Sequence, residues 1–189
     1  DTRQWNVIAT TGLTKPATAV ALVNNIAYIA QGNATNIRRI RFNPAAAPPA
    51  HEGADDGTNK ADLLYTHYVG GTEAVLWKAS NSSTVHDSNK IARAVHTTTW
   101  GTNLTFGTEI AVGDGTFPIT GLTDYDGNLY VFKQDSVWKI ISDKPEKLAV
   151  GLGTSPDENN GRTAQALGLF LYFSYMASVE RLYGSTLDD

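Results

Sequence analysis

Short apolar and polar runs alternate along this chain in the pattern typical of β-strands separated by tight turns. The clearest example is Ile119–Ser142, which reads ITGLTDYDGNLYVFKQDSVWKIIS and is interrupted at Asp126-Gly127 and at Asp135-Ser136. Asp-Gly between alternating runs favours a type I′ turn, because that turn requires a positive φ at both central residues. This stretch therefore predicts three antiparallel strands joined by two hairpin turns.

Three further units repeat this layout, with turn residues between alternating runs. Their ranges are Ala19–Phe42, Ala61–Ser80 and Thr163–Gly184. The predicted turns of these units fall at Asn24-Asn25, Gly32–Asn36, Gly70-Gly71, Gly168 and Ala177-Ser178. We expect an all-β protein that forms a single domain over 1–189, with repeat cores over 17–42, 61–80, 119–142 and 163–184.

Each unit also places a tyrosine ahead of a triplet made of an apolar residue, any residue and a base. The tyrosines are Tyr28, Tyr65, Tyr130 and Tyr172, and the triplets are Ile37-Arg38-Arg39, Leu76-Trp77-Lys78, Val137-Trp138-Lys139 and Val179-Glu180-Arg181. The separations from the tyrosine to the apolar residue are 9, 11, 7 and 7. An odd separation across an even-length hairpin loop keeps two residues on one face of a sheet. Every unit is therefore predicted to direct these two side chains to the same face.

The triplets favour packing over binding. Trp77 and Trp138 hold the same place in their triplets, which predicts that both pack between neighbouring sheets, where large aromatic side chains bury the most area. The alternative for these tryptophans is stacking on sugar rings or nucleobases in a groove. The bases that end the triplets are expected to lay their stems over the tyrosine rings in cation–π contacts; these bases are Arg39, Lys78, Lys139 and Arg181.

Two long segments between the units are predicted as inserted loops. The segment 44–62 is rich in Pro, Ala, Gly and Asp and has no apolar period. The segment 81–118 contains the apolar stretches Ile91–Val95 and Leu104–Val112. We interpret them as an outer strand followed by an extra hairpin, and the alternative is a degenerate fifth unit.

The repeated layout resembles a β-propeller, in which short four-stranded blades surround a common axis. The resemblance covers 17–184, and successive tyrosines lie 37, 65 and 42 residues apart, compared with about 40 to 50 residues in propeller blades. It implies a β-propeller-like array of about four antiparallel blades, which is either an incomplete ring or a fragment of a larger propeller. The stretch Leu122–Ile140, LTDYDGNLYVFKQDSVWKI, also resembles blades of poorly characterised bacteriophage virion proteins associated with the capsid or tail.

Composition excludes several classes of function. Lys and Arg number 15 against 19 Asp and Glu, a net charge of −4 that lacks the basic excess needed to bind nucleic acid. The longest nearly apolar run, Ala166–Val179, has 14 residues, and a bilayer span needs about 20, so no membrane insertion is expected. The absence of cysteine excludes thiolate sites. The opening residues DTRQWNV lack an initiator Met and a leader pattern, which predicts a processed or partial chain.

Few residues suggest site chemistry. Asp124, Asp126 and Asn128 superficially match a shortened calcium loop, but the distal Glu is missing and the Asp-Gly pair is better explained as a hairpin turn. The four histidines lack the close spacing of a helical metal motif; they are His51, His67, His86 and His96, of which His67 shares a strand face with Tyr65. We therefore expect no cofactor, no metal and no catalytic residue.

The leading hypothesis is a non-enzymatic structural protein that contacts other protein subunits of a larger assembly such as a phage virion. An incomplete repeat array exposes sheet faces that a neighbour must cover, which favours such an assembly. The resemblance implies a virion or extracellular location. One alternative is a carbohydrate-binding or adhesion propeller that uses Trp100 or Trp5, and another is a propeller hydrolase.

Overall fold

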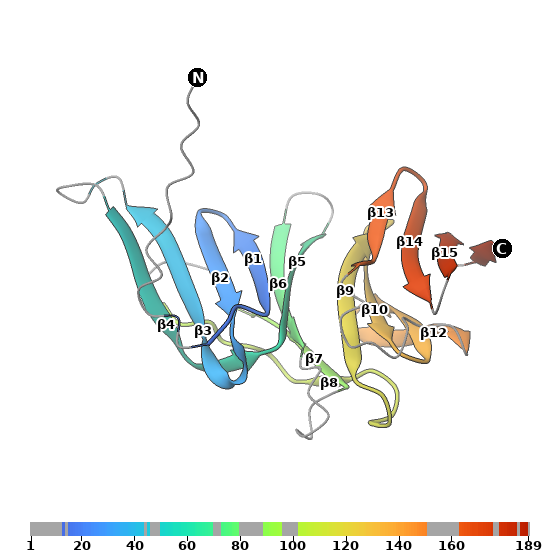
Figure 1. The fold of residues 1–189 in the computed structure, drawn as a ribbon, viewed down its shortest axis with the longest axis horizontal. Helices are drawn as coiled ribbons and strands as arrows, with labels where there is room; N and C mark the ends of the chain where they lie inside the picture. The colour runs from blue at the N-terminus through green and yellow to red at the C-terminus, as the bar shows by residue number, and fades with distance from the viewer. Residues whose placement is uncertain are drawn as a thin grey trace.

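The computed structural model describes residues 13, 15–43, 45, 50–69, 73–79, 89–95, 102–150, 163–175, 178–184 and 186–188. Over these residues the chain forms four four-stranded antiparallel sheets and no α-helix (Figure 1). Each sheet uses four strands that are consecutive in the chain, so adjacent strands in a sheet are also adjacent in sequence. The predicted all-β class is thereby confirmed. We number the sheets 1 to 4 in chain order.

All sixteen strands follow this simple order. Sheet 1 contains β1 (Ala19–Val23), β2 (Ile26–Ala30), β3 (Gly32–Asn43) and β4 (Ala50–Ala61). Sheet 2 contains β5 (Leu63–Val69), β6 (Glu73–Ala79), β7 (Lys90–Arg93) and β8 (Ile110–Ala111). Sheet 3 contains β9 (Ile119–Tyr125), β10 (Asn128–Lys133), β11 (Ser136–Ile141) and β12 (Lys144–Val150). Sheet 4 contains β13 (Gln165–Leu167), β14 (Phe170–Tyr175), β15 (Ser178–Tyr183) and β16 (Thr186–Asp188).

The hairpin turns of sheet 3 show how local sequence builds these sheets. Asp126 and Gly127, between β9 and β10, have φ of 49° and 70°, the two positive angles that a type I′ turn requires. Ser142 and Asp143, between β11 and β12, also have positive φ, 49° and 62°. The second turn of this kind was not predicted, because Ser-Asp is a weaker turn signal than Asp-Gly.

The segment 44–62, predicted as an inserted loop, instead contains β4. This strand is held by charge as well as by its backbone ladder, because acidic residues of β4 pair with the arginines of β3. The ion pairs are Arg41–Glu52 at 3.0 Å, Arg38–Asp55 at 3.1 Å and Arg39–Asp56 at 3.4 Å. A strand of polar residues at a sheet edge has no apolar period, so the hydrophobic pattern could not reveal it.

The unit 61–80 also differs from its prediction, because it supplies only the first two strands of sheet 2. The third and fourth strands, β7 and β8, lie inside the segment 81–118, which was predicted as an inserted loop. Both strands overlap the apolar stretches 91–95 and 104–112 that the sequence indicated, but their distance from β6 along the chain hid that they complete its sheet. The predicted outer strand at 91–95 is in fact the third strand of its sheet.

Each tyrosine was predicted to share a face of its sheet with the apolar residue of its triplet. This prediction holds in three units and fails in one. Tyr28 lies opposite Arg39, Tyr130 opposite Lys139 and Tyr172 opposite Arg181, each tyrosine on the second strand of its sheet. Tyr65 instead lies on a first strand, opposite Trp77. Val69 pairs with Glu73 across a three-residue connection, and an odd loop reverses the parity on which the prediction depended.

Three apolar cores separate the sheets. The first joins side chains of sheets 1 and 2, the second those of sheets 2 and 3, and the third those of sheets 3 and 4. The first strands β1, β5, β9 and β13 are neighbours in that order. The sheets therefore pack face to face in chain order, running from sheet 1 at the left of Figure 1 to sheet 4 at the right.

Candidate functional site

A polar junction joins sheet 2 to sheet 3 around Asp124 of β9. One carboxylate oxygen of Asp124 contacts Nδ1 of His67, and the other accepts the backbone N–H of Tyr68 at 3.2 Å. The backbone N–H of Asp124 donates to the hydroxyl of Tyr65 at 3.0 Å. His67 and Tyr65 reach the same residue because they are two positions apart on β5 and share a face. These bonds align the first strands of the two sheets.

The three candidate metal ligands do not converge. Asp124 pairs with Leu129 in the β9–β10 ladder and Asn128 pairs with Tyr125, which is the adjacent register position. Side chains at adjacent positions point to opposite faces of a sheet, so Asp124 and Asn128 cannot hold the same ion. The amide of Asn128 donates to the backbone oxygen of Asp126 at 2.7 Å, which stabilises the turn. No group of three or more metal-ligating side chains occurs in the described part of the chain.

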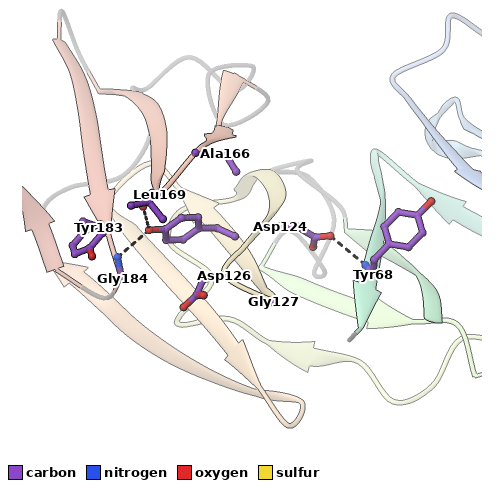
Figure 2. A pocket seen from close by; sticks show the side chains of 10 residues that line it. Tyr68, Asp124, Asp126, Gly127, Ala166, Leu169, Tyr183 and Gly184 are labelled. Atoms are coloured by element: carbon purple, nitrogen blue, oxygen red, sulfur yellow. Dashed lines mark hydrogen bonds between the residues drawn. The ribbon is translucent and has the colours of Figure 1, made fainter. Parts of the chain in front are cut away.

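A pocket of about 580 Å³ opens between the β9–β10 turn and the ends of sheet 4 (Figure 2). One of its lining residues is Tyr125, whose hydroxyl donates to the backbone oxygen of Leu169 and accepts the N–H of Gly184 at 2.9 Å. The ring of Tyr125 also packs edge-on against Tyr130, with centroids 5.5 Å apart. The hydroxyl thus already holds two loops of sheet 4 in place. Sequence reasoning missed Tyr125, although it immediately precedes the predicted Asp126-Gly127 turn.

Arg39, one of the predicted bases, belongs to a buried polar network on β3. Its side chain is 4% exposed and lies 3.4 Å from the carboxylate of Asp56, which is fully buried. Asp56 also accepts the backbone N–H of Leu104 at 2.8 Å and the amide of Asn59 at 3.0 Å. Arg39 donates in turn to the backbone oxygen of Thr102. The network fastens the segment around 102–104 to sheet 1.

Lys133 is a buried cation that the sequence analysis did not single out. Its side-chain nitrogen donates to the backbone oxygens of Val112 at 3.0 Å and Asp114 at 2.7 Å. Burial lowers the pKa of Lys133, and the negative charges of Asp135 and Asp114 oppose that shift. These bonds hold the connection that enters sheet 3, so the geometry assigns Lys133 a structural role.

The two predicted tryptophans are not at equivalent positions. Trp77 lies on β6, the second strand of sheet 2, whereas Trp138 lies on β11, the third strand of sheet 3. Both nevertheless contact the core between sheets 2 and 3, where Trp77 is 3% exposed. The ring of Trp138 covers Gly113, where a Cβ atom would come within 2.8 Å of it. The two rings therefore reach one core from different strands.

The predicted cation–π contacts involve different rings. The side-chain nitrogen of Lys78 lies 4.9 Å from the ring centroid of Phe106, and the guanidinium of Arg181 lies 4.6 Å from that of Phe170. Lys139 lies directly opposite Tyr130 in the β10–β11 ladder. Arg39, Lys139 and Arg181 lie opposite the repeat tyrosines in their ladders, whereas Lys78 lies opposite Leu64.

Among the residues that the structure describes, no sheet packs on one face of sheet 4. Leu171, Phe173 and Leu182 point into the third core. The opposite face, here called the forward face, carries the alternate side chains Leu167, Phe170, Tyr172, Val179, Arg181 and Tyr183. Val179 is 71% exposed and Leu167 is 69% exposed, while Phe170 packs against both Tyr172 and Tyr183. The forward face is therefore an exposed apolar and aromatic surface with one cation.

Sheet 1 has the matching feature at the other end of the array. Its inner face, with Tyr28 and Ile37, enters the first core. Its opposite face, here called the back face, carries Val20, Leu22, Ala27, Ile29, Ile40 and one cation, Arg38, which pairs with Asp55. Val20 is 58% exposed and Leu22 is 62% exposed, whereas Ile29 is 9% exposed, so the exposed apolar part of this face lies on β1. Large exposed apolar surfaces at sheet ends are typical of interaction sites.

Several sequence predictions fall outside the described residues. Trp5 and Trp100, the candidates for sugar stacking, lie there, as do His86 and His96. His51 lies on β4, and its side chain is also outside the described part. In the portion that the structure describes, no helix has the length and apolar character needed to cross a membrane.

The Tyr130 hydroxyl provides a test of how tightly sheets 3 and 4 pack. This side chain is fully buried, and its hydroxyl donates to the backbone oxygen of Gly184 at 3.4 Å. Burial, together with Tyr125 and Asp126, raises the pKa of Tyr130 to about 12 from 10.0. The folded state therefore keeps the proton that the unfolded chain loses, and about 2–3 kcal/mol of stability present below pH 10 should be lost between pH 10 and 12.

The measurement is urea unfolding of the wild type and of Tyr130→Phe across pH 8 to 12. We expect the free energy of unfolding to fall less steeply above pH 10 in the variant, because phenylalanine cannot ionise. Parallel pH profiles in the two proteins would show that Tyr130 ionises equally easily in the folded and unfolded states.

No known protein family matches this chain, and no curated protein matches it. Among solved structures it is similar to the crystal structure of the computationally designed Ika4 protein, with 12% sequence identity and a TM-score of 0.45. That alignment covers 92% of this chain and 94% of the designed chain.

Proposed function

We propose that this chain is a non-enzymatic structural component of a larger assembly such as a phage virion, and that its four sheets are propeller-like blades. Its function is to contact other protein subunits through the two uncovered end faces. The observation that carries the proposal is that the forward face of sheet 4 and the back face of sheet 1, at opposite ends of the array, both carry exposed apolar side chains beside one arginine each. Such faces bury favourably against a protein neighbour.

The arrangement of the cores supports a blade-like relation between the sheets. Each core joins sheets that are consecutive in the chain, and the first strands of consecutive sheets are neighbours. Blades of a propeller pack in this way, with their first strands nearest the axis. An array of this kind that does not close leaves one face uncovered at each end.

The polar groups of the pocket between sheets 3 and 4 support a structural role for that region. Asp124 is bonded to His67 and to the backbone of Tyr68, and the hydroxyl of Tyr125 is bonded to two loops of sheet 4. A ligand that used these groups would have to break bonds that hold the sheets together. Their hydrogen-bonding capacity is directed to the fold itself.

The test is association with assembled particles. Particles released by the cells that make this chain would be purified on a density gradient, and its peptides quantified against the main shell protein. We expect a fixed ratio between the two across preparations. A photo-crosslinker at position 183 of the forward face should also give crosslinks to protein, whereas one at position 69 should give few.

Two results would contradict the proposal. The first is a chain that stays in the soluble fraction and never sediments with particles. The second is specific binding on a glycan array combined with no crosslinking at the forward face, which would favour the carbohydrate-binding alternative.

A further inference from the structure

We propose that the partner of the forward face is the back face of a second copy of this chain, so that two copies close head to tail into one ring of eight sheets. This inference rests on the proposed function, because it names the occupant of the same two faces. The register of the strands supports the inference. It aligns each end face with a face of sheet 3 that is buried against a neighbouring sheet.

The forward face of sheet 4 matches the face of sheet 3 that packs on sheet 4. Tyr172 lies opposite Arg181 as Tyr130 lies opposite Lys139, and Val179 follows Tyr172 at the same interval as Val137 follows Tyr130. Val137 is 1% exposed because sheet 4 covers it, whereas Val179 is 71% exposed. The same apolar position is therefore present, with Ser174 in the place of Phe132, and no sheet among the described residues covers it.

The back face of sheet 1 matches the face of sheet 3 that packs on sheet 2. Tyr28 corresponds to Tyr130, so that Val20 of the first strand corresponds to Leu122. Leu122 is 8% exposed in the second core, whereas Val20 is 58% exposed.

Two more positions extend this match. Ile29 corresponds to Val131 and Ile40 to Ile140, and both residues of sheet 3 are buried against sheet 2. At these three positions the back face of sheet 1 has the apolar pattern of a face that receives another sheet, and Arg38 stands where sheet 3 has Trp138.

Any second copy carries both halves of this interface. The forward face of the first copy can pack on the back face of the second copy. The forward face of the second copy then packs on the back face of the first. Two head-to-tail contacts related by a two-fold axis give a closed dimer with no face left over. Eight blades lie within the usual range for propellers, about four to eight.

The primary test is the mass of the purified chain in solution by light scattering and native mass spectrometry, from about 1 to 100 µM, a range that spans typical dimer affinities. We expect twice the chain mass of 20.3 kDa. A monomer over the whole range would overturn the proposal, and so would an open-ended series of larger species, since a head-to-tail contact that does not close makes filaments.

Single substitutions test the head-to-tail geometry. Val179→Glu on the forward face and Val20→Glu on the back face should each weaken the dimer at least about 30-fold, because each places a charged group where the contact buries apolar surface. Both side chains are exposed within one copy, so the fold should be retained. The matched control is Val69→Glu, which alters an exposed valine of β5 outside both faces and should leave the dimer intact.

Mixing the two variants separates this geometry from a symmetric contact. A mixed dimer keeps one unaltered interface, between the forward face of the Val20→Glu chain and the back face of the Val179→Glu chain. Mixing should therefore restore part of the association. A dimer that only one of the two substitutions disrupts would instead join like faces and overturn the head-to-tail proposal.

The two proposals can fail separately. A chain that is monomeric in solution but present in particles at a fixed ratio would overturn the second-copy proposal and leave the proposed function standing. A chain that dimerises head to tail but never associates with particles would overturn the proposed function and leave the second-copy proposal standing.

Discussion

Replacing Asp56 by alanine is expected to lower the free energy of unfolding by about 3–5 kcal/mol, the cost of leaving a buried ion-pair partner without its counter-charge. Asp56 is fully buried, and its carboxylate accepts bonds from the backbone of Leu104 and from Asn59 besides pairing with Arg39. The alanine variant leaves the Arg39 charge buried beside an empty space. Urea unfolding followed by circular dichroism measures the change as a shift in the midpoint.

The adjacent acid gives a matched control for this prediction. Asp55 pairs with Arg38 at 3.1 Å, but its side chain is 58% exposed, and a surface ion pair contributes about 0–1 kcal/mol. We therefore expect Asp55→Ala to change stability by less than about 1 kcal/mol. Equal losses in the two variants would mean that burial of the Asp56 network does not determine its contribution.

The second large effect is expected for Phe132→Ala in the core between sheets 3 and 4. Phe132 is fully buried, and its ring centroid lies 5.2 Å from that of Phe173 on the next sheet. Removing a buried phenylalanine ring costs about 3–5 kcal/mol, because apolar burial is lost and a cavity remains. The free energy of unfolding should fall by this amount, because the ring contact between Phe132 and Phe173 is lost from the third core.

Two further variants calibrate the Phe132 result. Phe132→Leu retains much of the apolar volume and should be less destabilising than alanine. Val69→Ala removes apolar atoms from a side chain that is 42% exposed and should change stability by about 0.5 kcal/mol or less. A loss below about 1 kcal/mol for Phe132→Ala would indicate that sheets 3 and 4 contribute little to each other's stability.

Sequence reasoning was most successful where structure depends on neighbouring residues. Asp126-Gly127 predicted its turn correctly because the required positive φ angles are a property of those two residues. The first three strands of sheets 3 and 4 were also predicted, because turn residues delimit short apolar runs such as β10 and β14. Local chemistry was sufficient in these cases.

It was least successful where pairing depends on distant residues. β4 is stabilised by arginines that precede it in the chain, and sheet 2 takes its last two strands from short segments far from the first two. Tyr65 failed the parity rule because the length of one hairpin loop was misjudged. The Asp124 junction and the Tyr125 bonds link residues more than 40 positions apart, so no local pattern could indicate them.

The sequence by itself determined that this protein is all-β and built from repeated hairpins, because alternation and turn residues act over a few positions. Only the tertiary structure decided which faces of the sheets are buried and which remain exposed. Val137 and Val179 hold the same place in their units, yet one is covered and the other is not. The reason is physical: burial of a side chain depends on the sheet that packs against it, and that sheet comes from a distant part of the chain.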